Sequence, residues 1–193
     1  MREIPTLETE RLVLRPFSLQ DAATVQQLAG DVAVADTTLN IPHPYLDGMA
    51  EDWISKHGEA FAKLEGLTLA ITRKSDGSVV GAISLIGIAD GHRAELAYWI
   101  GKPYWNQGFC TEAGRAVVRF AFRDLGLLRV HAWHFGRNPA SGRIMRKLGM
   151  RHEGTLRQHV RKWDGYEDLE LYGLLKQEWA AESAAQDCAI PRL

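Results

Sequence analysis

Residues 94–122, AELAYWIGKPYWNQGFCTEAGRAVVRFAF, predict a strand, a turn and a helix in immediate succession. The run Ala94–Gly101 is apolar and aromatic, and Glu95 is the one acid within it. Pro103 ends the strand because proline cannot donate to the strand ladder and disfavours the helical conformation in the residue before it. Thr111 then opens a helix, since apolar residues recur behind it at helical spacing.

The turn between this strand and helix favours an anion site. A helix begins with unpaired backbone N–H groups and a partial positive charge. Gly108, in the turn Asn106–Cys110, lets a ligand approach the backbone closely. Together these features suit a pyrophosphate. A tight strand-to-helix turn without any ligand explains the same residues equally well.

The composition limits the classes of protein to consider. The 193 residues suit one domain, and 46% hydrophobic with 24% charged residues is typical of a globular protein. A net charge of −1 argues against nucleic-acid and membrane partners. Cys110 and Cys188 form no disulfide or metal pattern, which favours a reducing, cytoplasmic setting. We expect neither a signal peptide nor a membrane span.

The order of predicted elements before a terminal helix is β-α-α-β-β-β-α-β-α-β-β. Strands outnumber helices and hairpins mix with crossovers, so we predict a mixed sheet flanked by helices and not a doubly wound parallel sheet. Residues 1–185 are expected to form one domain and residues 186–193 a flexible tail. The predicted strands span 7–17, 67–73, 79–88, 94–101, 128–135, 150–157 and 168–175; the helices span 19–30, 47–64, 111–124, 138–148 and 177–185; 36–47 is a loop.

A second informative stretch is 130–150, VHAWHFGRNPASGRIMRKLGM, in which a strand leads into a helix. Asn138 precedes Pro139 and Ser141, so Asn138 serves as a simple helix cap or as a ligand contact. A basic run surrounds this helix, and it is either a solvated face or a field that steers an anionic ligand. Its members are Arg137, Arg143, Arg146, Lys147, Arg151, Arg157, Arg161 and Lys162.

No metal site is expected. His131 and His134 are three apart on a predicted strand, so they point to opposite faces. Cys110 has no acid or base partner in its motif and is interpreted as a small buried residue. The phosphate-binding motifs of ATP-type and dinucleotide folds do not occur in the sequence.

In combination, these segments resemble the GNAT superfamily of acyl-CoA-dependent N-acyltransferases, within it the RimJ/RimL-like branch that acetylates ribosomal-protein N-termini. The resemblance runs from about Leu7 to Trp179. It implies a single GNAT-like domain with a mostly antiparallel central sheet. The pieces that carry it are ETERLVLRPF, AELAYWIGKPYWNQGFCTEA, NPASGRIMRKLGM, EGTLR and GYEDLELYGLL.

The resemblance also implies roles for individual residues toward acetyl-CoA. Asn138 would hydrogen-bond the pantetheine region, and Ser141 would lie near the sulfur and stabilise the departing thiolate. Tyr98, Trp99 and Ile100 would line the pantetheine arm. The backbone N–H groups of the turn would hold the pyrophosphate; its residues are Asn106, Gln107, Gly108, Phe109, Cys110 and Thr111.

Three positions depart from the family pattern. Cys110 stands where the phosphate loop usually has glycine or alanine, but it keeps a small side chain. Met145 stands where many relatives have a tyrosine acid, so Ser141 inherits that role. Val160 matches a carboxylate used by some ribosomal-protein relatives, which weakens the case for the same ribosomal substrate.

The predicted reaction is direct transfer of an acetyl group from acetyl-CoA to a primary amine. Glu95 is the candidate base, acting directly or through a water, because a carboxylate beside an aromatic wall has a raised pKa. An exposed acid that balances Arg93 is the alternative.

The acceptor is predicted to be a protein or peptide N-terminal α-amine. The alternatives are a small amine, such as an antibiotic, a polyamine or an amino acid, and a non-catalytic acyl-CoA-binding sensor. A homodimer is among the partners expected, because relatives often dimerise. Five acids in or near the loop and helix that would cover the acceptor side either attract a cationic amine or face solvent: Asp36, Asp47, Glu51, Asp52 and Glu59.

Overall fold

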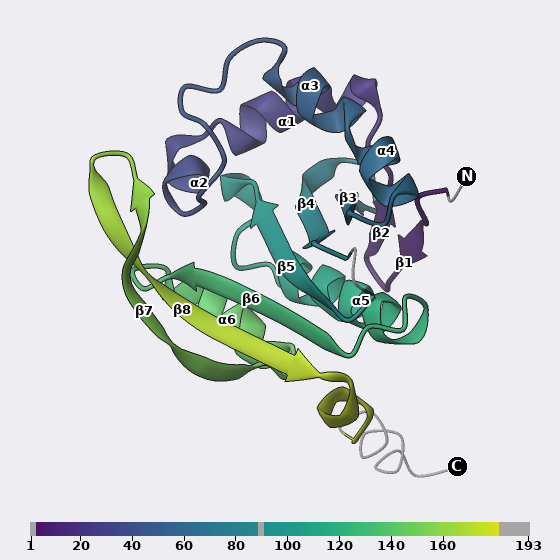
Figure 1. The fold of residues 1–193 in the computed structure, drawn as a ribbon. Helices are drawn as coiled ribbons and strands as arrows, with labels where there is room; N and C mark the ends of the chain where they lie inside the picture. Colours follow the sequence, from purple (N-terminus) through teal and green to yellow (C-terminus); the bar gives the residue numbers. More distant parts are fainter. Residues whose placement is uncertain (1–2, 89–90, 182–193) are drawn as a thin grey trace.

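The computed structural model describes residues 3–88 and 91–181, and the eight strands of this part belong to one sheet (Figure 1). Their order across the sheet is β1-β2-β3-β4-β5-β6-β8-β7. Every neighbouring pair is antiparallel except β5 with β6. The predicted mixed, mostly antiparallel sheet is therefore confirmed. The strands are β1 (Leu7–Glu8), β2 (Leu12–Arg15), β3 (Gly66–Arg73), β4 (Val79–Ile86), β5 (Arg93–Ile100), β6 (Arg129–Phe135), β7 (Arg151–Lys162) and β8 (Gly165–Leu175).

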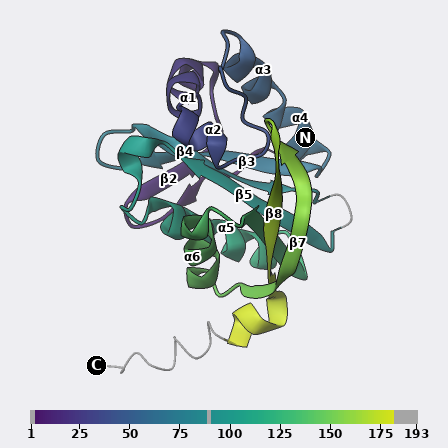
Figure 2. The ribbon, with the colours of Figure 1, turned by 90° about the vertical axis from the view of Figure 1, so that its left-hand side faces the viewer.

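Helices cover both faces of the sheet. Figure 2 shows α1–α4 on one side of β3–β5, and α5 and α6 on the other. A large core joins the sheet to α5, and a smaller one lies between α1 and α3. The α-helices are α1 (Ala22–Ala29), α2 (Val32–Asp36), α3 (Met49–Ser55), α4 (His57–Ala62), α5 (Phe109–Arg123) and α6 (Pro139–Lys147), and two short 3-10 helices are η1 (Leu19–Asp21) and η2 (Lys102–Tyr104).

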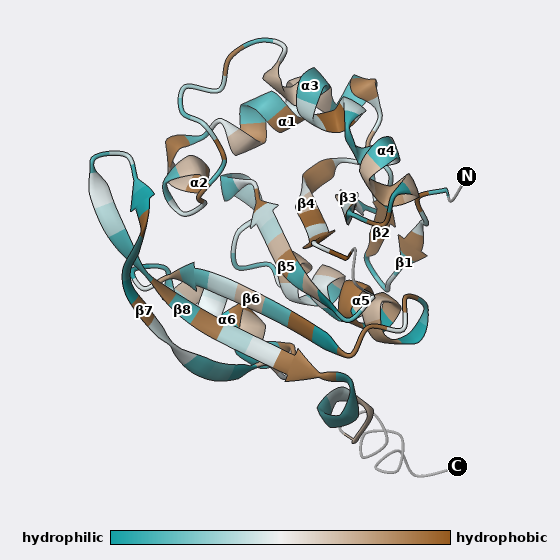
Figure 3. Cartoon of the chain, viewed as in Figure 1, coloured by the Kyte–Doolittle hydropathy of each residue, from teal (hydrophilic) through white to brown (hydrophobic). Residues whose placement is uncertain are grey.

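Burial along the strands follows their place in the sheet. The central strand β4 is buried at most positions, and Figure 3 colours it almost wholly hydrophobic. The edge strand β7 is exposed along most of its length and mixes hydrophilic with hydrophobic residues. A strand covered on both faces needs continuous apolar sequence, whereas an edge strand needs polar residues that keep it soluble.

The one parallel pair in the sheet is short. Strands β5 and β6 pair only at Arg93, Ala94 and Glu95, opposite Arg129–His131. Beyond Glu95 the two strands diverge (Figure 1), while β5 stays paired with β4 and β6 stays paired with β8. The sheet therefore opens into a wedge whose narrow end lies at Glu95.

Two predicted elements are each divided in the structure. The strand predicted over 7–17 is two strands, because the hydroxyl of Thr9 and the backbone of Leu12 bond each other and close a turn. The helix predicted over 47–64 is α3 and α4, which separate at Lys56. Helix α2 ends at Asp36, ahead of the loop predicted over 36–47, and was not predicted.

The C-terminal elements agree with the prediction in order but differ in extent. Strands β7 and β8 are longer than predicted, because their pairing continues to Lys162 and Gly165 at the tip of the hairpin. Residues 176–181 are helical, and the predicted tail at 186–193 lies outside the described residues. Over the described ranges, no helix has the length and apolarity to cross a membrane, and no three His, Cys, Asp or Glu side chains gather as a metal site.

Candidate active site

A cleft of about 830 Å³ occupies the wedge between β5 and β6. Its walls come from β4 and β5, from the start of α5, from α6, and from the segment between Val34 and Trp53. The structure thus brings nearly all predicted site residues to one cavity. Those that line it are Glu95, Tyr98, Trp99, Ile100, Asn106, Gly108, Phe109, Cys110, Thr111, Asn138 and Ser141.

Gln107 differs from the other predicted residues of the turn. Its side-chain amide donates to the carbonyl of Pro103 at 3.0 Å, and its own carbonyl accepts from Arg11 Nη1 at 3.1 Å. The side chain is therefore held within the turn. Its backbone N–H as a pyrophosphate contact stays a prediction.

The start of α5 presents unpaired backbone donors to the cleft. Gly108 is the N-cap, and its φ of +81° is a left-handed conformation that favours glycine. The first intrahelical bond runs from Glu112 N to Gly108 O at 3.1 Å, and no side chain of the described residues caps this end. The N–H groups of Phe109, Cys110 and Thr111 therefore remain available to a ligand.

The β1–β2 turn braces this helix start, a contact that the sequence did not reveal. Glu112 Oε1 accepts from Thr9 Oγ1 at 2.6 Å and from the backbone N of Arg11 at 2.8 Å. Glu112 Oε2 accepts from Arg11 Nε at 2.7 Å. Burial opposes ionisation of Glu112, but these bonds outweigh it and lower its pKa. Arg11 also lies over the ring of Phe109, 4.8 Å from its centroid. We call Thr9, Arg11 and Glu112 the clamp.

Tyr98 and Ser141 meet across the wedge. Tyr98 Oη lies 2.8 Å from Ser141 Oγ, where either hydroxyl can donate, and it can also donate to the Ser141 carbonyl at 3.2 Å. Ser141 is buried in the first turn of α6, where its backbone N donates to Asn138 Oδ1 at 3.4 Å. Asn138 therefore caps α6 and also lines the cleft. Burial raises the pKa of Tyr98, so its hydroxyl stays protonated.

Glu95 lies at the narrow end of the wedge. It is half-buried, and it is the last residue of β5 that pairs with β6. Burial raises its pKa, and a hydrogen bond from the Trp133 side chain partly offsets that effect. Strand alternation puts Glu95 on the same face as Ala97 and Trp99, which also line the cleft. The carboxylate thus borders an aromatic wall.

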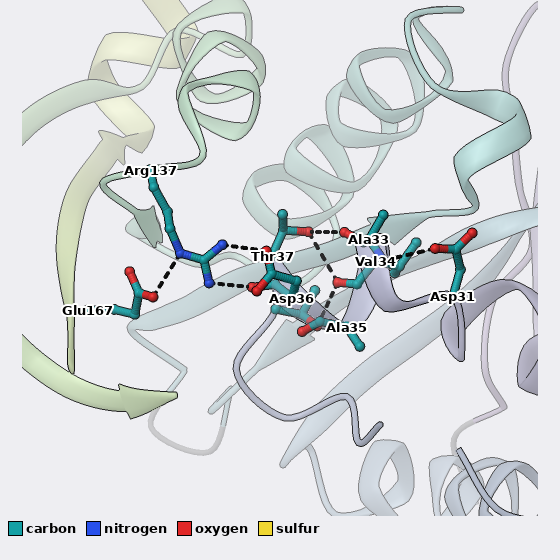
Figure 4. A network of polar contacts seen from close by, with 9 residues as sticks. Asp31, Ala33, Val34, Ala35, Asp36, Thr37, Arg137 and Glu167 are labelled. Carbon is teal, nitrogen blue, oxygen red and sulfur yellow. Dashed lines mark hydrogen bonds and ion pairs between the residues drawn. The ribbon is translucent and has the colours of Figure 1, made fainter. Parts of the chain in front are cut away.

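The loop after α2 lines one side of the cleft. Arg137 holds the end of α2, where this loop begins (Figure 4). Arg137 donates to Asp36 Oδ2 at 2.6 Å and to the Asp36 carbonyl at 2.7 Å, and its Nε donates to Glu167 at 2.8 Å. Buried Lys162, at the tip of β7, donates to the carbonyls of Leu39 and Ile41 at 3.3 and 3.4 Å. We call the Arg137 and Lys162 contacts the latch.

The predicted basic run therefore divides into several roles. Arg137 and Lys162 form the latch, and Arg151 pairs with Glu178 at 2.8 Å. Arg143 and Lys147 line the cleft on α6, so they can face an anionic ligand. This arrangement lies between the two predicted alternatives, a solvated face and a steering field.

Comparisons with known proteins agree with this geometry. The model of the family described as Acetyltransferase (GNAT) domain matches residues 11–151. "Uncharacterized N-acetyltransferase YoaA" of Bacillus subtilis is 31% identical over 173 residues, 89% of this chain and 97% of its own length. "Putative ribosomal N-acetyltransferase YdaF" of the same organism is 32% identical over 139 residues, 72% of this chain and 73% of its own.

The solved structures show the same fold. The structure of RimL, a ribosomal L7/L12 α-N-protein acetyltransferase in complex with coenzyme A, superposes with a TM-score of 0.81 at 16% identity. The match covers 89% of this chain and 98% of that one. The family match extends over most of the wedge, including β5, the start of α5 and the Asn138–Ser141 turn. The chain therefore belongs to the GNAT acetyltransferase family and is an acyl-CoA-dependent N-acetyltransferase.

Proposed function

We propose that the cleft transfers an acetyl group from acetyl-CoA directly to a primary amine held at Glu95. The observation that carries the proposal is the arrangement along one cleft: an open helix start, the Tyr98–Ser141 pair and the half-buried carboxylate of Glu95. An anion site, a hydroxyl donor and a base are the three groups that this transfer needs.

The residues of the wedge fit acetyl-CoA. The free N–H groups of Phe109, Cys110 and Thr111 suit the pyrophosphate, and the left-handed conformation of Gly108 lets the chain turn into this helix start. The edge of β5 that β6 leaves unpaired, from Tyr98 to Ile100, suits the amides of the pantetheine arm, as in strand addition. When bound, acetyl-CoA supplies the activated acetyl thioester.

Glu95 would take the proton that the amine must lose before it attacks. A base works best when its pKa lies near the operating pH, and burial moves the pKa of Glu95 upward, toward that range. Trp133 donates a hydrogen bond to the carboxylate, and Trp99 lines the same cleft. Glu95 therefore has the environment expected of a general base.

Ser141 would donate a hydrogen bond to the sulfur as charge develops on it. A serine hydroxyl has one proton, so its direction depends on its neighbours. When Tyr98 donates to Ser141 Oγ, the serine proton is free to point toward the sulfur. We assign Tyr98 the role of orienting Ser141. Buried Met145 stands where many relatives have a tyrosine acid, so we assign the acid's role to Ser141.

We propose a peptide N-terminal α-amine as the first acceptor to test, supported by the names of YdaF and RimL. A small amine is the second candidate. The observation that favours it is the latch, which holds the loop after α2 over the acceptor side.

The test is an acceptor screen. The protein is mixed with acetyl-CoA and either peptides with free N-termini or small amines, and release of the CoA thiol is followed. Amine-dependent release with a matching acetylated product supports the proposal. Tight CoA binding without release for any amine contradicts it.

A further inference from the structure

The part of the cleft away from α5, which we call the acceptor half, is rich in aromatic and apolar side chains. It is lined by the segment between Val34 and Trp53 and by the indoles of Trp99 and Trp133. Trp53 and Trp99 also pack against the smaller core, so these walls are fixed by the fold. The other large side chains of this lining are Ile41, Tyr45 and Met49. Such a surface favours an apolar body.

Few carboxylates line the acceptor half. Within the described ranges, the carboxylates that line the cleft are those of Glu95 and Asp52. Asp52 Oδ2 forms an ion pair with Lys56 Nζ at 2.5 Å. The other predicted acids lie outside the cleft lining: Asp36 pairs with Arg137, Glu59 pairs with Lys63, Asp47 accepts from the neutral amide of Gln26, and Glu51 is exposed. Glu95 is left as the cleft carboxylate without a cationic partner in the described chain.

One available carboxylate matches one ammonium group. A second ammonium would enter an apolar cavity without a counter-charge, which carries a large desolvation cost. The indole of Trp99, which shares a strand face with Glu95, would stabilise the first ammonium further through its ring face. Asp36 and Glu167 neutralise Arg137, so Lys162 is the latch cation that adds positive charge near the loop after α2, which disfavours a second ammonium there.

We infer that the acceptor is a monoamine whose single ammonium is attached to an aromatic or apolar body. This inference rests on the proposed function and names its substrate class. The chemistry can come from a free monoamine or from a peptide whose first residue is aromatic. Polyamines, and peptides that begin with lysine, are poor acceptors.

The experiment compares kcat/KM for four probes with acetyl-CoA and the full-length enzyme. They are 2-phenylethylamine, spermidine, and two peptides of equal length that begin with phenylalanine or lysine. We expect each aromatic probe to exceed its polycationic counterpart by about tenfold or more, the order expected when a charge is left unpaired in an apolar site. Comparing 2-phenylethylamine with the phenylalanine peptide shows whether the enzyme prefers a free monoamine or a peptide N-terminus. Equal or higher kcat/KM for spermidine overturns the inference.

Two lysine variants test the charge argument directly. Lys56→Gln frees the Asp52 carboxylate beside the cleft, and Lys63→Gln is the matched control because it breaks a similar i,i+4 pair, with Glu59 at 2.6 Å, outside the cleft lining. We expect Lys56→Gln to raise the kcat/KM of spermidine relative to 2-phenylethylamine about threefold, the scale of an exposed ion pair. Lys63→Gln should leave the ratio unchanged. An unchanged ratio in both variants contradicts the inference.

A binding measurement separates the inference from the reaction. Tryptophan fluorescence of the CoA-loaded protein reports amine binding, since Trp99 and Trp133 line the acceptor half. Saturable binding of 2-phenylethylamine without transfer to any probe overturns the proposed reaction and supports the acceptor class. Transfer with a preference for spermidine supports the reaction and overturns the class.

Discussion

The two halves of the cleft are built in different ways. The half that we propose for acetyl-CoA, called the cofactor half, comes from one contiguous stretch, β5 through the start of α5, together with the first turn of α6. The acceptor half is a long connection held in place by residues far along the chain, such as Arg137 on Asp36 and Lys162 on Leu39. The first half can therefore stay constant while the second changes, and acceptor choice can vary on one cofactor site.

The largest expected effect comes from the residue that lies between the halves. Glu95→Gln should lower kcat/KM for the amine by about 10²–10⁴-fold, because the variant cannot accept a proton. Wild-type activity should fall as the pH drops through the raised pKa of Glu95, and the variant should lack that limb. The loss is therefore greatest at high pH. Rate profiles over pH and the Kd of CoA, which should stay unchanged, provide the test.

Within the cofactor half, Ser141→Ala should lower kcat by about 10²-fold, as for removal of one donor to developing charge. Tyr98→Phe should lower kcat less, by about tenfold, because it removes only the orienting bond at 2.8 Å. The double variant should be no slower than Ser141→Ala alone. Additive losses in the steady-state kcat would separate Tyr98 from Ser141.

Loss of the clamp should weaken CoA binding and leave the KM of the amine unchanged. Glu112→Gln weakens the bonds that brace the start of α5, so we expect the Kd of CoA to rise about tenfold, as for loss of charge-assisted hydrogen bonds. Glu8→Gln is the control, since it breaks an exposed ion pair with Lys74 on the same edge of the sheet. Calorimetry measures both. If Glu112→Gln raised the KM of the amine and left CoA affinity unchanged, the clamp would support the acceptor half and not the cofactor half.

The latch should show the opposite pattern. Arg137→Gln should raise the KM of the amine about threefold to tenfold and leave the Kd of CoA unchanged, because the loop after α2 loses its hold. Arg129→Gln is the matched control: it removes an arginine–glutamate pair with Glu153 near the other end of β6. Equal effects of the two substitutions on amine KM would exclude a specific role for the latch.

The smallest expected effect concerns acid stability behind the acceptor half. Burial lowers the pKa of His57 to about 4, and the ring packs edge-on against Trp53 at 4.4 Å. The unfolded chain binds a proton near pH ~6.5 and the folded chain only near the lower value. The free energy of unfolding should therefore fall as the pH drops from the unfolded-state pKa of histidine, about 6.5, toward about 4. His57→Phe should remove this part of the decline in denaturant titrations at pH 7.5 and 5, and an identical decline would refute it.

The same contrast explains what the sequence could predict. The proposed anion site lies within one run of sequence, where strand periodicity, a glycine and a helical pattern follow one another, so local rules suffice to propose it. The clamp and the latch join residues 101 positions apart, Arg11 with Glu112 and Arg137 with Asp36. No periodicity relates such residues, so these contacts were missed.

Sequence patterns also failed where a side-chain hydrogen bond determines the local structure. The turn at Thr9 contains no glycine or proline and is closed by a threonine hydroxyl, so the sequence suggested one continuous strand. The Tyr98–Ser141 pair was missed for a different reason. Both residues were predicted to line the cofactor site, but only the angle between β5 and α6 brings their oxygens to 2.8 Å.

The three-residue pairing of β5 with β6 has a consequence for heat resistance. Past Glu95 the protein keeps an unfilled strand edge in its interior, which an extended ligand can complete. A ligand that binds only the folded chain raises its melting temperature in proportion to the logarithm of concentration, once saturating. Preparations purified without acetyl-CoA should thus melt earlier than loaded ones. Differences in Tm between preparations should then reflect cofactor carry-over as well as sequence.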